Sequence, residues 1–221
     1  MMGFSIMSKV KLNKKFFLIL LSIIFFWIIY SLNVDFKQKS VIQLYYDFLD
    51  GNCEIEGRSI SDIIVPTGEP ARRYATDYII LDSNGDDMPE LHIRNAREFL
   101  IFSYRDDELF VFQSFFSEPW NIHLLENGSF IFNADRGNTI GEYYRYFELD
   151  IEGNKMNEIE FYWDDINEDY ISDEKDQYVF DGNVYSMREW YEWTEEYIYV
   201  DKEGRNQLCN EVEWEIYCRG R

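Results

Sequence analysis

Basic residues and the usual ligands for zinc and disulfides are scarce in this chain. It has 3 cysteines and 2 histidines in 221 residues, and 42 aspartates and glutamates outnumber 21 lysines and arginines. The histidines lie in strand-like runs without cysteines at ligand spacing, which argues against zinc. An odd number of cysteines excludes complete pairing within the chain. Cys209 and Cys218 flank EVEWEIY and form a bridge only if that segment folds back; three separate thiols are the alternative.

The signatures of common enzyme classes are also missing. The chain has no glycine-rich loop of the kind that cradles a phosphate, and neither histidine belongs to a local motif with a serine or cysteine nucleophile. Adjacent carboxylates such as Asp164 and Asp165 are expected by chance in so acidic a chain, so they do not indicate a glycosidase. These absences favour a binding module over an enzyme.

The N-terminus contains the one long apolar run. Residues 16–32, FFLILLSIIFFWIIYSL, carry no charge, and the run reaches residue 34 if Asn33 and Val34 are included. This is the length of a short membrane span. The small residues that precede a signal-peptide cleavage site are missing, so the run is interpreted as an uncleaved signal anchor. Four lysines and no acidic residue precede it, which predicts a cytoplasmic N-terminus.

Three segments follow from this interpretation. Residues 1–15 are a cytoplasmic basic segment, residues 16–34 a transmembrane anchor, and residues 35–221 an acidic extracytoplasmic β-rich domain. The first 32 residues carry four lysines and no acid, so the net charge of −21 for the whole chain leaves −25 on the rest. Such a surface repels nucleic acid and attracts cations or basic proteins. A simpler reading is that the charge keeps an aromatic-rich domain soluble.

The middle of the chain has the pattern of antiparallel strands. The β-rich runs, separated by polar turns, are DYIILD, ELHIR, FLIFSY, ELFVFQSFF, WNIHLL, SFIFNA, YYRYFELD and KMNEIEFYW. Their spacing predicts a meander. Asn127-Gly128 suits a two-residue hairpin turn, and this role accounts for the Asn-Gly-Ser sequence without glycosylation.

Two short helices frame the predicted sheet. Apolar residues at helical spacing predict a helix over Ser40–Asp50 that Gly51 ends. A capping box that starts at Ser186 predicts a second helix, along which Trp190, Trp193 and Tyr197 share one face as core residues. The expected fold class is therefore α+β, a mainly antiparallel β meander with a short N-terminal helix and a C-terminal helix, after one transmembrane helix.

The stretch DSNGDDMPE concentrates acidic residues between two predicted strands. Asp82, Asn84, Asp86 and Glu90 occupy positions 1, 3, 5 and 9 of this loop. Alternate side chains of a tightly wound loop converge on one point, and oxygen ligands at these positions, with a backbone carbonyl at position 7, suit Ca²⁺ better than Mg²⁺. The position-6 glycine of such loops is replaced by Asp87, a residue type that tolerates left-handed backbone.

A second stretch, DINEDYISD, repeats the spacing. Asp165, Asn167, Asp169 and Asp173 occupy positions 1, 3, 5 and 9, and Asp176 follows at position 12. Tyr170 at position 6 disfavours the sharp turn. Both loops are candidate calcium sites, and the second is expected to bind weakly or not at all. The alternative is that acidic turns simply cap strands in an acidic protein.

The residues YIILDSNGDDMPELHI resemble the calcium-loop pattern D-x-N-x-D-G-x-x-D of FG-GAP and VCBS-type extracellular β proteins, and WDDINEDYISDEKD resembles it less closely. A short helix followed by a strand–DxNxDGxPEL–strand unit also resembles uncharacterised membrane-anchored extracytoplasmic proteins of clostridia. These resemblances imply calcium-type loops on an extracytoplasmic β-rich domain and bring no known activity.

The expected function is a membrane-anchored extracytoplasmic binding module. The sequence does not identify its ligand. A glycan held on exposed aromatic rings is one candidate ligand, with Trp120, Trp163 and Trp214 as the candidate rings, although burial in the core is the more usual fate of each. An acidic structural or inhibitory protein that meets a basic protein partner is the alternative, and a carbohydrate-active enzyme is the third reading.

Overall fold

The computed structural model describes residues 14–64, 76–116, 121–134, 141–166, 172–202 and 205–216, and only the backbone of residues 14–18. The chain divides into two units, Met1–Ser40 and Val41–Arg221.

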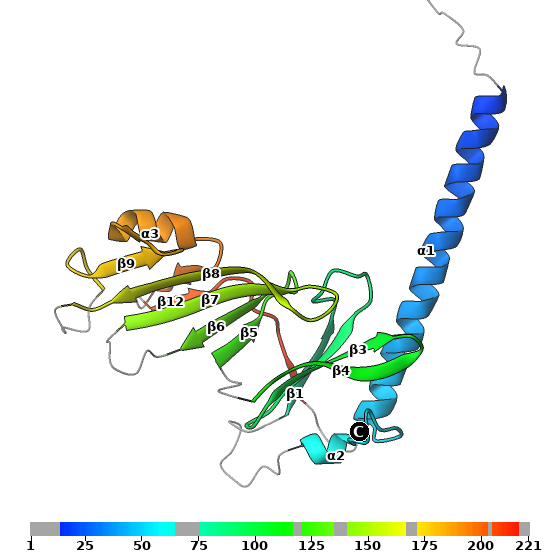
Figure 1. The fold of residues 1–221 in the computed structure, drawn as a ribbon, viewed down its shortest axis with the longest axis horizontal. Helices are drawn as coiled ribbons and strands as arrows, with labels where there is room; N and C mark the ends of the chain where they lie inside the picture. The colour runs from blue at the N-terminus through cyan, green and yellow to red at the C-terminus, as the bar shows by residue number, and fades with distance from the viewer. Residues whose placement is uncertain are drawn as a thin grey trace, which may run out of the picture. The chain divides into compact units, whose positions relative to one another are not determined.

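The apolar run belongs to one long helix, α1, Lys14–Leu49 (Figure 1). Its part Ile19–Leu49 is long and apolar enough to cross a membrane, a property that membrane anchors share with signal sequences. The helix predicted over Ser40–Asp50 is present, but it is the last part of α1 and not a separate element. Helix α1 continues through NVDFKQK because this stretch has no glycine or proline to interrupt it. Asp35 and Lys39 also form an ion pair of 2.9 Å one turn apart in this stretch.

The helix ends where the sequence predicted. Gly51 has a φ of +76°, a left-handed conformation that glycine adopts without steric cost. Its N–H donates to the carbonyl of Phe48 at 2.9 Å, so the last turn closes on itself.

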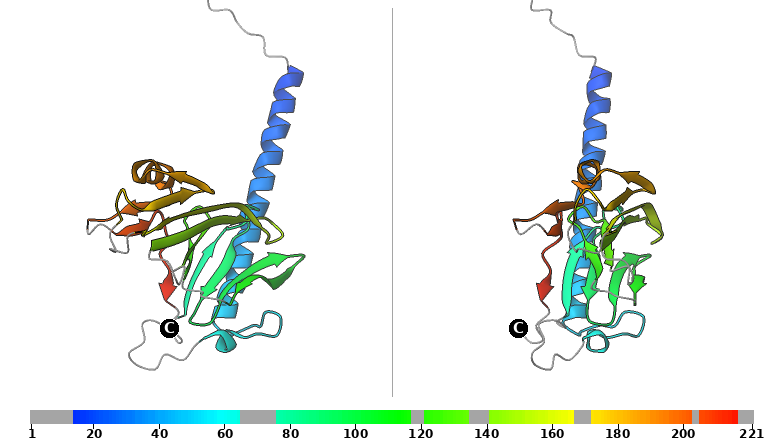
Figure 2. Two further views of the ribbon diagram at one scale, coloured as in Figure 1. Left: turned by 60° about the vertical axis from the view of Figure 1, so that its left-hand side comes forward. Right: turned by 90° about the vertical axis from the view of Figure 1, so that its left-hand side faces the viewer.

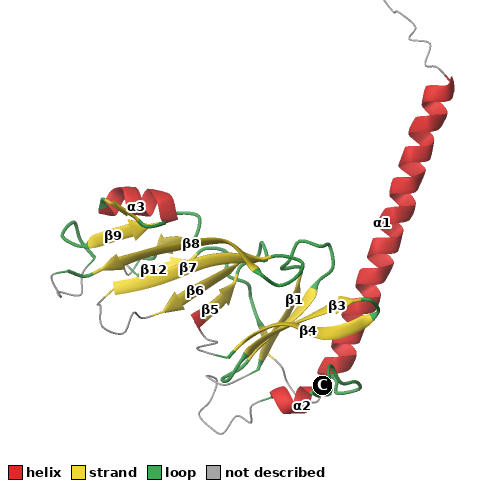
Figure 3. Ribbon diagram, in the orientation of Figure 1, coloured by secondary structure: helices red, strands yellow, loops and turns green. Residues whose placement is uncertain are grey.

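Two antiparallel sheets make up most of the unit Val41–Arg221, as the strand colouring of Figure 3 shows. Sheet 1 consists, in spatial order, of β13 (Glu215–Ile216), β1 (Asp77–Leu81), β2 (Glu90–Arg94), β3 (Phe99–Arg105) and β4 (Glu108–Phe115). Sheet 2 consists of β10 (Asn183–Tyr185), β9 (Gln177–Phe180), β8 (Lys155–Asp164), β7 (Gly141–Leu149), β6 (Phe130–Ala134) and β5 (Ile122–Leu124). The remaining elements are the pair β11 (Ile198–Val200) and β12 (Asn206–Leu208), and the helices α2 (Ile60–Ile63) and α3 (Met187–Thr194). The expected α+β class with a β-rich meander is confirmed.

Buried side chains place these elements in layers. One apolar cluster lies between the last turns of α1 and strands β2 and β3, and contains Tyr45. A second, with Phe130, lies between β3 and strands β5 to β7, so the two sheets pack face to face. A third, with Trp190, lies between sheet 2 and α3, and Figures 1 and 2 show α3 over the β8–β9 end of that sheet. Strands β2 and β3, in the middle of sheet 1, therefore bury both faces over most of their length.

The second helix forms as its capping box predicts. The Ser186 side chain accepts from the Glu189 N–H, and the Glu189 carboxylate accepts from the Ser186 N–H at 3.1 Å. The expectation of one core-facing aromatic stripe was wrong in part: Trp190 is fully buried, but Trp193 is 54% exposed. Helix α3 stops at Thr194, so Tyr197, which is buried, is not part of the helical face.

The turn between β5 and β6 is longer than the two residues expected. The strands end at Leu124 and resume at Phe130, and only Gly128 of the Asn127-Gly128 pair has a positive φ, +85°. The Gly128 N–H donates to the carbonyl of Leu125, and the Leu125 N–H donates to the carbonyl of Ser129, both at 2.9 Å. This is a three-residue hairpin loop with glycine in the left-handed position.

Candidate functional site

The first acidic loop connects β1 to β2, and its first residue organises it. The Asp82 carboxylate accepts from the N–H of Gly85 at 2.8 Å and from the N–H of Asp87 at 3.0 Å. Gly85 and Asp87 both have left-handed backbone, with φ of +74° and +66°. Asp87 thus adopts the conformation required of the residue that replaces the position-6 glycine.

The next two side chains of the pattern bond to the backbone in the same way. The Asn84 side-chain oxygen accepts from the N–H of Asp86 at 3.0 Å, and an Asp86 oxygen accepts from the N–H of Met88 at 2.8 Å. Each bond closes a local turn from a side chain to the amide two residues ahead. The side chains at positions 3 and 5 are therefore held against the loop and do not extend freely into solvent.

Glu90, at position 9, has a different role. It is fully buried, and each carboxylate oxygen accepts two hydrogen bonds. One oxygen accepts from the N–H and the hydroxyl of Ser83, at 2.8 and 3.1 Å. The other accepts from the Asn84 amide at 3.0 Å and from the Ser103 hydroxyl of β3 at 3.2 Å. A carboxylate has about four acceptor positions, so Glu90 is saturated by the protein itself.

Burial makes the charge of Glu90 costly. It raises the pKa of Glu90 to about 8, and the nearby charges of Asp86 and Asp82 push it the same way, while the bonds from Ser83 oppose the shift. A cation within the loop would relieve this cost, because it would stabilise all three charged carboxylates together.

The loop is also anchored from behind. The Tyr45 hydroxyl, near the end of α1, lies within hydrogen-bond distance of the carbonyls of Pro89, at 3.0 Å, and Phe102, at 3.2 Å. Burial, followed by the charges of Glu90 and Asp86, raises the pKa of Tyr45. The C-terminal end of the loop is thereby fixed to both α1 and β3.

Within the described ranges, no group of three or more His, Cys, Asp or Glu side chains is arranged so that it could hold a metal ion. At this loop the acceptor positions of Glu90 are already filled by donors of the protein. Asp82, Asn84 and Asp86 fit the first three positions of a calcium loop, whereas Glu90 must release at least one of its donors before it can act as a ligand.

The second acidic loop is described only in part. Asn167 and Asp169 lie outside the described residues. Asp165 is buried, and Asp173 forms an ion pair with Lys175 at 2.9 Å. Hydrogen bonds from the side chain and the backbone of Lys175 lower the pKa of Asp173. The position-9 residue of this loop is therefore already paired with a cation of the protein.

The two aromatic candidates that the structure describes do not offer a flat platform. Trp163 is buried in the core beneath α3, and the ring of Trp214 is covered by the Arg94 guanidinium, 4.4 Å from the ring centroid. Trp120 lies outside the described residues, as does Cys218, the partner considered for Cys209.

A hollow of about 430 Å³ lies beside the β5–β6 loop of the same unit, and no sequence pattern indicated it. Its lining comes from the β5–β6 loop, strand β7, the segment before β11 and the turn after β12: Leu125, Glu126, Asn127, Tyr146, Glu196, Tyr197 and Asn210. The volume is within the range of small-molecule sites. Only the Asn127-Gly128 pair gave any signal, and it indicated a turn.

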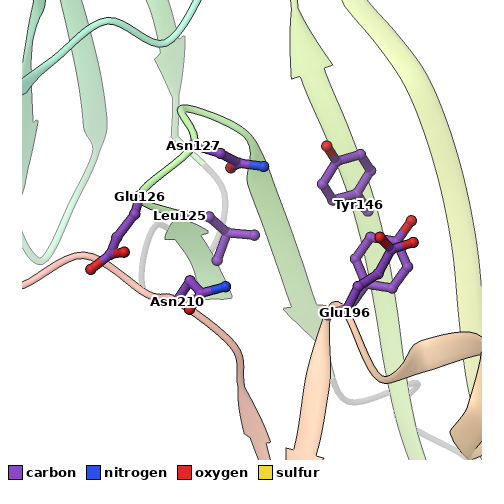
Figure 4. A pocket seen from close by; sticks show the side chains of 7 residues that line it. Leu125, Glu126, Asn127, Tyr146, Glu196 and Asn210 are labelled. Carbon is purple, nitrogen blue, oxygen red and sulfur yellow. The ribbon is translucent and has the colours of Figure 1, made fainter. Parts of the chain in front are cut away.

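The two sides of the hollow differ in chemistry (Figure 4). Leu125, Asn127 and Asn210 face Tyr146 and Glu196 across it, while the carboxylate of Glu126 turns away. The Asn127 side-chain oxygen is occupied, since it lies 3.1 Å from the N–H and 2.6 Å from the hydroxyl of Ser129. That assignment leaves the Asn127 NH₂ group, a donor, on the side of the hollow.

The opposite side consists of two tyrosine rings and one carboxylate, that of Glu196. The ring centroids of Tyr146 and Tyr197 lie 5.0 Å apart, and the Tyr146 hydroxyl donates to Glu148 at 2.7 Å. Burial, above all, raises the pKa of both tyrosines, and hydrogen bonds with Glu148 and Glu196 add to the shifts. Both hydroxyls therefore stay protonated at neutral pH and donate to the carboxylates of Glu148 and Glu196. The acceptor that this side can offer to a ligand is the carboxylate of Glu196.

The acidic loop is in contact with the β5–β6 loop, part of which lines the hollow. A Cβ atom added to Gly128, in the loop that forms one side of the hollow, would lie 2.5 Å from the carbonyl oxygen of Asp82 and 2.9 Å from the Cα of Ser83. The backbone of the β5–β6 loop thus rests on the first residues of the acidic loop.

Comparisons with protein families, with characterised proteins and with solved structures find no match to this chain.

Proposed function

We propose that the chain is a membrane-anchored binding module, with its N-terminus in the cytoplasm and its β-rich part outside. In this proposal the hollow beside Tyr146 receives the ligand, and a Ca²⁺ ion in the loop Asp82–Glu90 stabilises the surrounding sheet. The apolar helix α1 and the four lysines before residue 16 support the anchor.

The observation that carries the binding role is the hollow itself. It is concave, and its lining includes both donors and acceptors. A hydrolytic enzyme with paired carboxylates would need two of them directed at one bond. Figure 4 shows Glu126 turned away from the hollow that Glu196 faces, so this lining favours binding over hydrolysis.

The calcium role rests on the hydrogen bonds of the loop. Asp82, Asn84 and Asp86 would hold the ion together with the carbonyl of Met88 at position 7, and Glu90 would join after it releases a donor. When bound, the ion supplies a cross-link between the ends of β1 and β2. Extracellular calcium modules bind at about 10⁻⁴–10⁻³ M, so such a site fills outside cells.

The calcium role is tested by thermal melting of the full chain in lipid nanodiscs, in chelator and in excess calcium. At 100 times the dissociation constant, a ligand adds about 2.7 kcal/mol to stability, or about 5–10 °C for a domain of this size. The variant Asp82→Asn, Asp86→Asn removes two negative charges. It keeps one side-chain oxygen at each position but loses the second acceptor of Asp82, so each variant is compared with itself in chelator and in calcium. We expect it to lose most of this increment.

The matched control removes two charges elsewhere. Glu54 and Glu158 are exposed and lie outside both acidic loops, so Glu54→Gln, Glu158→Gln should keep the whole calcium increment. Equal losses in the two variants would mean that calcium only screens an acidic surface. No increment in the wild type would refute the calcium role.

The anchor is tested by N-terminal sequencing of the mature protein from membranes. We expect the sequence to begin at or near Met1. A start near Val34 or Asp35 would show that the apolar run is a cleaved signal peptide.

A further inference from the structure

The hollow presents donors on one side and acceptors on the other. On the first side, the Asn127 NH₂ group is free of its own turn, because Ser129 occupies only the amide oxygen. Asn210 is exposed on the same side, and its side chain faces the hollow in Figure 4. On the second side, the Glu196 carboxylate is an acceptor. A ligand that fills this space must therefore donate and accept in the same region.

The charges of the lining narrow the chemistry further. None of the described lining residues is a lysine or an arginine, so a carboxylate or phosphate ligand would meet Glu126 and Glu196 with no opposing charge. A purely cationic ligand would satisfy Glu196 but leave the amide donors of Asn127 and Asn210 unused. The hydroxyl groups of a ligand can form hydrogen bonds with both sides of the hollow, because each hydroxyl both donates and accepts.

Apolar surface lies between the polar groups. Leu125 and the ring of Tyr146 line the hollow and are largely buried in the surrounding core. The C–H faces of a sugar ring can pack on such surface while its hydroxyls bond to the rim.

We propose that this hollow binds a neutral sugar unit, with Asn127 and Asn210 donating to its hydroxyls and Glu196 accepting from them. The inference rests on the proposed binding role and names its ligand class. It relocates glycan binding from the exposed aromatic rings that the sequence suggested to a polar hollow with an apolar base.

The test uses the full chain in lipid nanodiscs, because common glycoside detergents are themselves sugars. The probes are the methyl glycosides of glucose, galactose and N-acetylglucosamine, followed by NMR saturation transfer and titration. We expect saturable binding of at least one of them. The variant Asn127→Asp, Asn210→Asp keeps the turn oxygen at position 127 and the left-handed backbone at position 210, where φ is +53°, and removes both NH₂ donors. It should bind at least tenfold more weakly.

The matched control makes the same chemical change outside the hollow. Asn52 and Asn183 are exposed and do not line it, so Asn52→Asp, Asn183→Asp should bind as the wild type does. Equal weakening in both double variants would overturn the assignment of the hollow. Circular dichroism and melting of each variant establish that it is folded.

A cationic probe, 1,4-diaminobutane, separates the sugar class from the binding role. If the diamine binds while the glycosides do not, and the Asn127→Asp, Asn210→Asp variant binds it more tightly, the sugar class is wrong and the binding role stands. If neither the glycosides nor the diamine bind, both proposals fail.

Discussion

Gly128 offers the sharpest test of the contact between the acidic loop and the hollow. Gly128→Ala introduces two costs. The first is the left-handed backbone, φ +85°, which costs an alanine about 1–2 kcal/mol. The second is the new Cβ, which would lie 2.5 Å from the Asp82 carbonyl oxygen, closer than real Cβ contacts occur. Relief requires the two backbones to separate, and overpacking of this kind costs about 1–3 kcal/mol.

Gly182 provides the matched control for the first cost alone. Its φ is +74° in the turn between β9 and β10, and nothing lies within 4 Å of an added Cβ. Gly182→Ala should therefore lose only the backbone contribution. We expect Gly128→Ala to melt at least about 2 °C below Gly182→Ala, at about 2–4 °C per kcal/mol for a domain of this size.

The measurement is thermal melting of the full chain in nanodiscs, with chelator and with calcium. Because the displaced atom belongs to Asp82, Gly128→Ala should also lose part of any calcium increment, and Gly182→Ala should keep it. Melting temperatures that agree within about 1 °C for the two variants would refute the reasoning, since they would show that the Gly128 contact costs nothing to break.

Two further predictions concern pH. The pKa of Glu90 is raised to about 8, so in chelator its contribution to stability is present below pH 4.5 and is lost as pH rises toward 8. Glu90→Gln lacks this dependence. In thermal melts across pH 5–8, the melting temperature of the wild type should therefore fall relative to that of the variant as pH rises; a difference that stays constant with pH would contradict the prediction. The pKa of Glu211 is shifted the other way: burial opposes ionisation, but the hydrogen bond with His123, 2.8 Å long, and the charges of His123 and Arg94 lower it overall. Its contribution is therefore present above pH 4.5 and lost as pH falls below that, so the wild type should exceed Glu211→Gln in melting temperature at pH 7 by a margin that narrows as pH falls below 4.5; a margin that is constant with pH would show that the charge is not involved.

Local chemistry made much of this protein predictable from its sequence. Alternating apolar residues indicated strands β1 to β8, because a side-chain period of two leaves a pattern that needs no knowledge of neighbours. Gly51 and the Ser186 capping box marked helix ends through interactions within a few residues. The turn-forming bonds of Asp82, Asn84 and Asp86 are likewise local, so the shape of the loop followed from its spacing.

Only the tertiary structure decided which side chains are buried and which partners they contact, because the sequence pattern holds no information about distant neighbours. Glu90 has the same spacing as a calcium ligand, yet Ser103, from a neighbouring strand, takes one of its acceptor positions and buries it. The sequence alone does not show whether Trp163 and Trp214 are exposed. In the structure, Trp163 is buried beneath α3, and the Arg94 guanidinium covers the ring of Trp214.

The hollow is the feature that the sequence was least able to predict, because its lining comes from four separate segments between residues 125 and 210. Its position depends on the sheet order and on the contact of Gly128 with Asp82, 46 residues earlier in the chain. Periodicity shows which side chains share a face of a strand. Which faces meet is settled only by long-range packing, and that packing brings Asn127, Glu196 and Asn210 to one place.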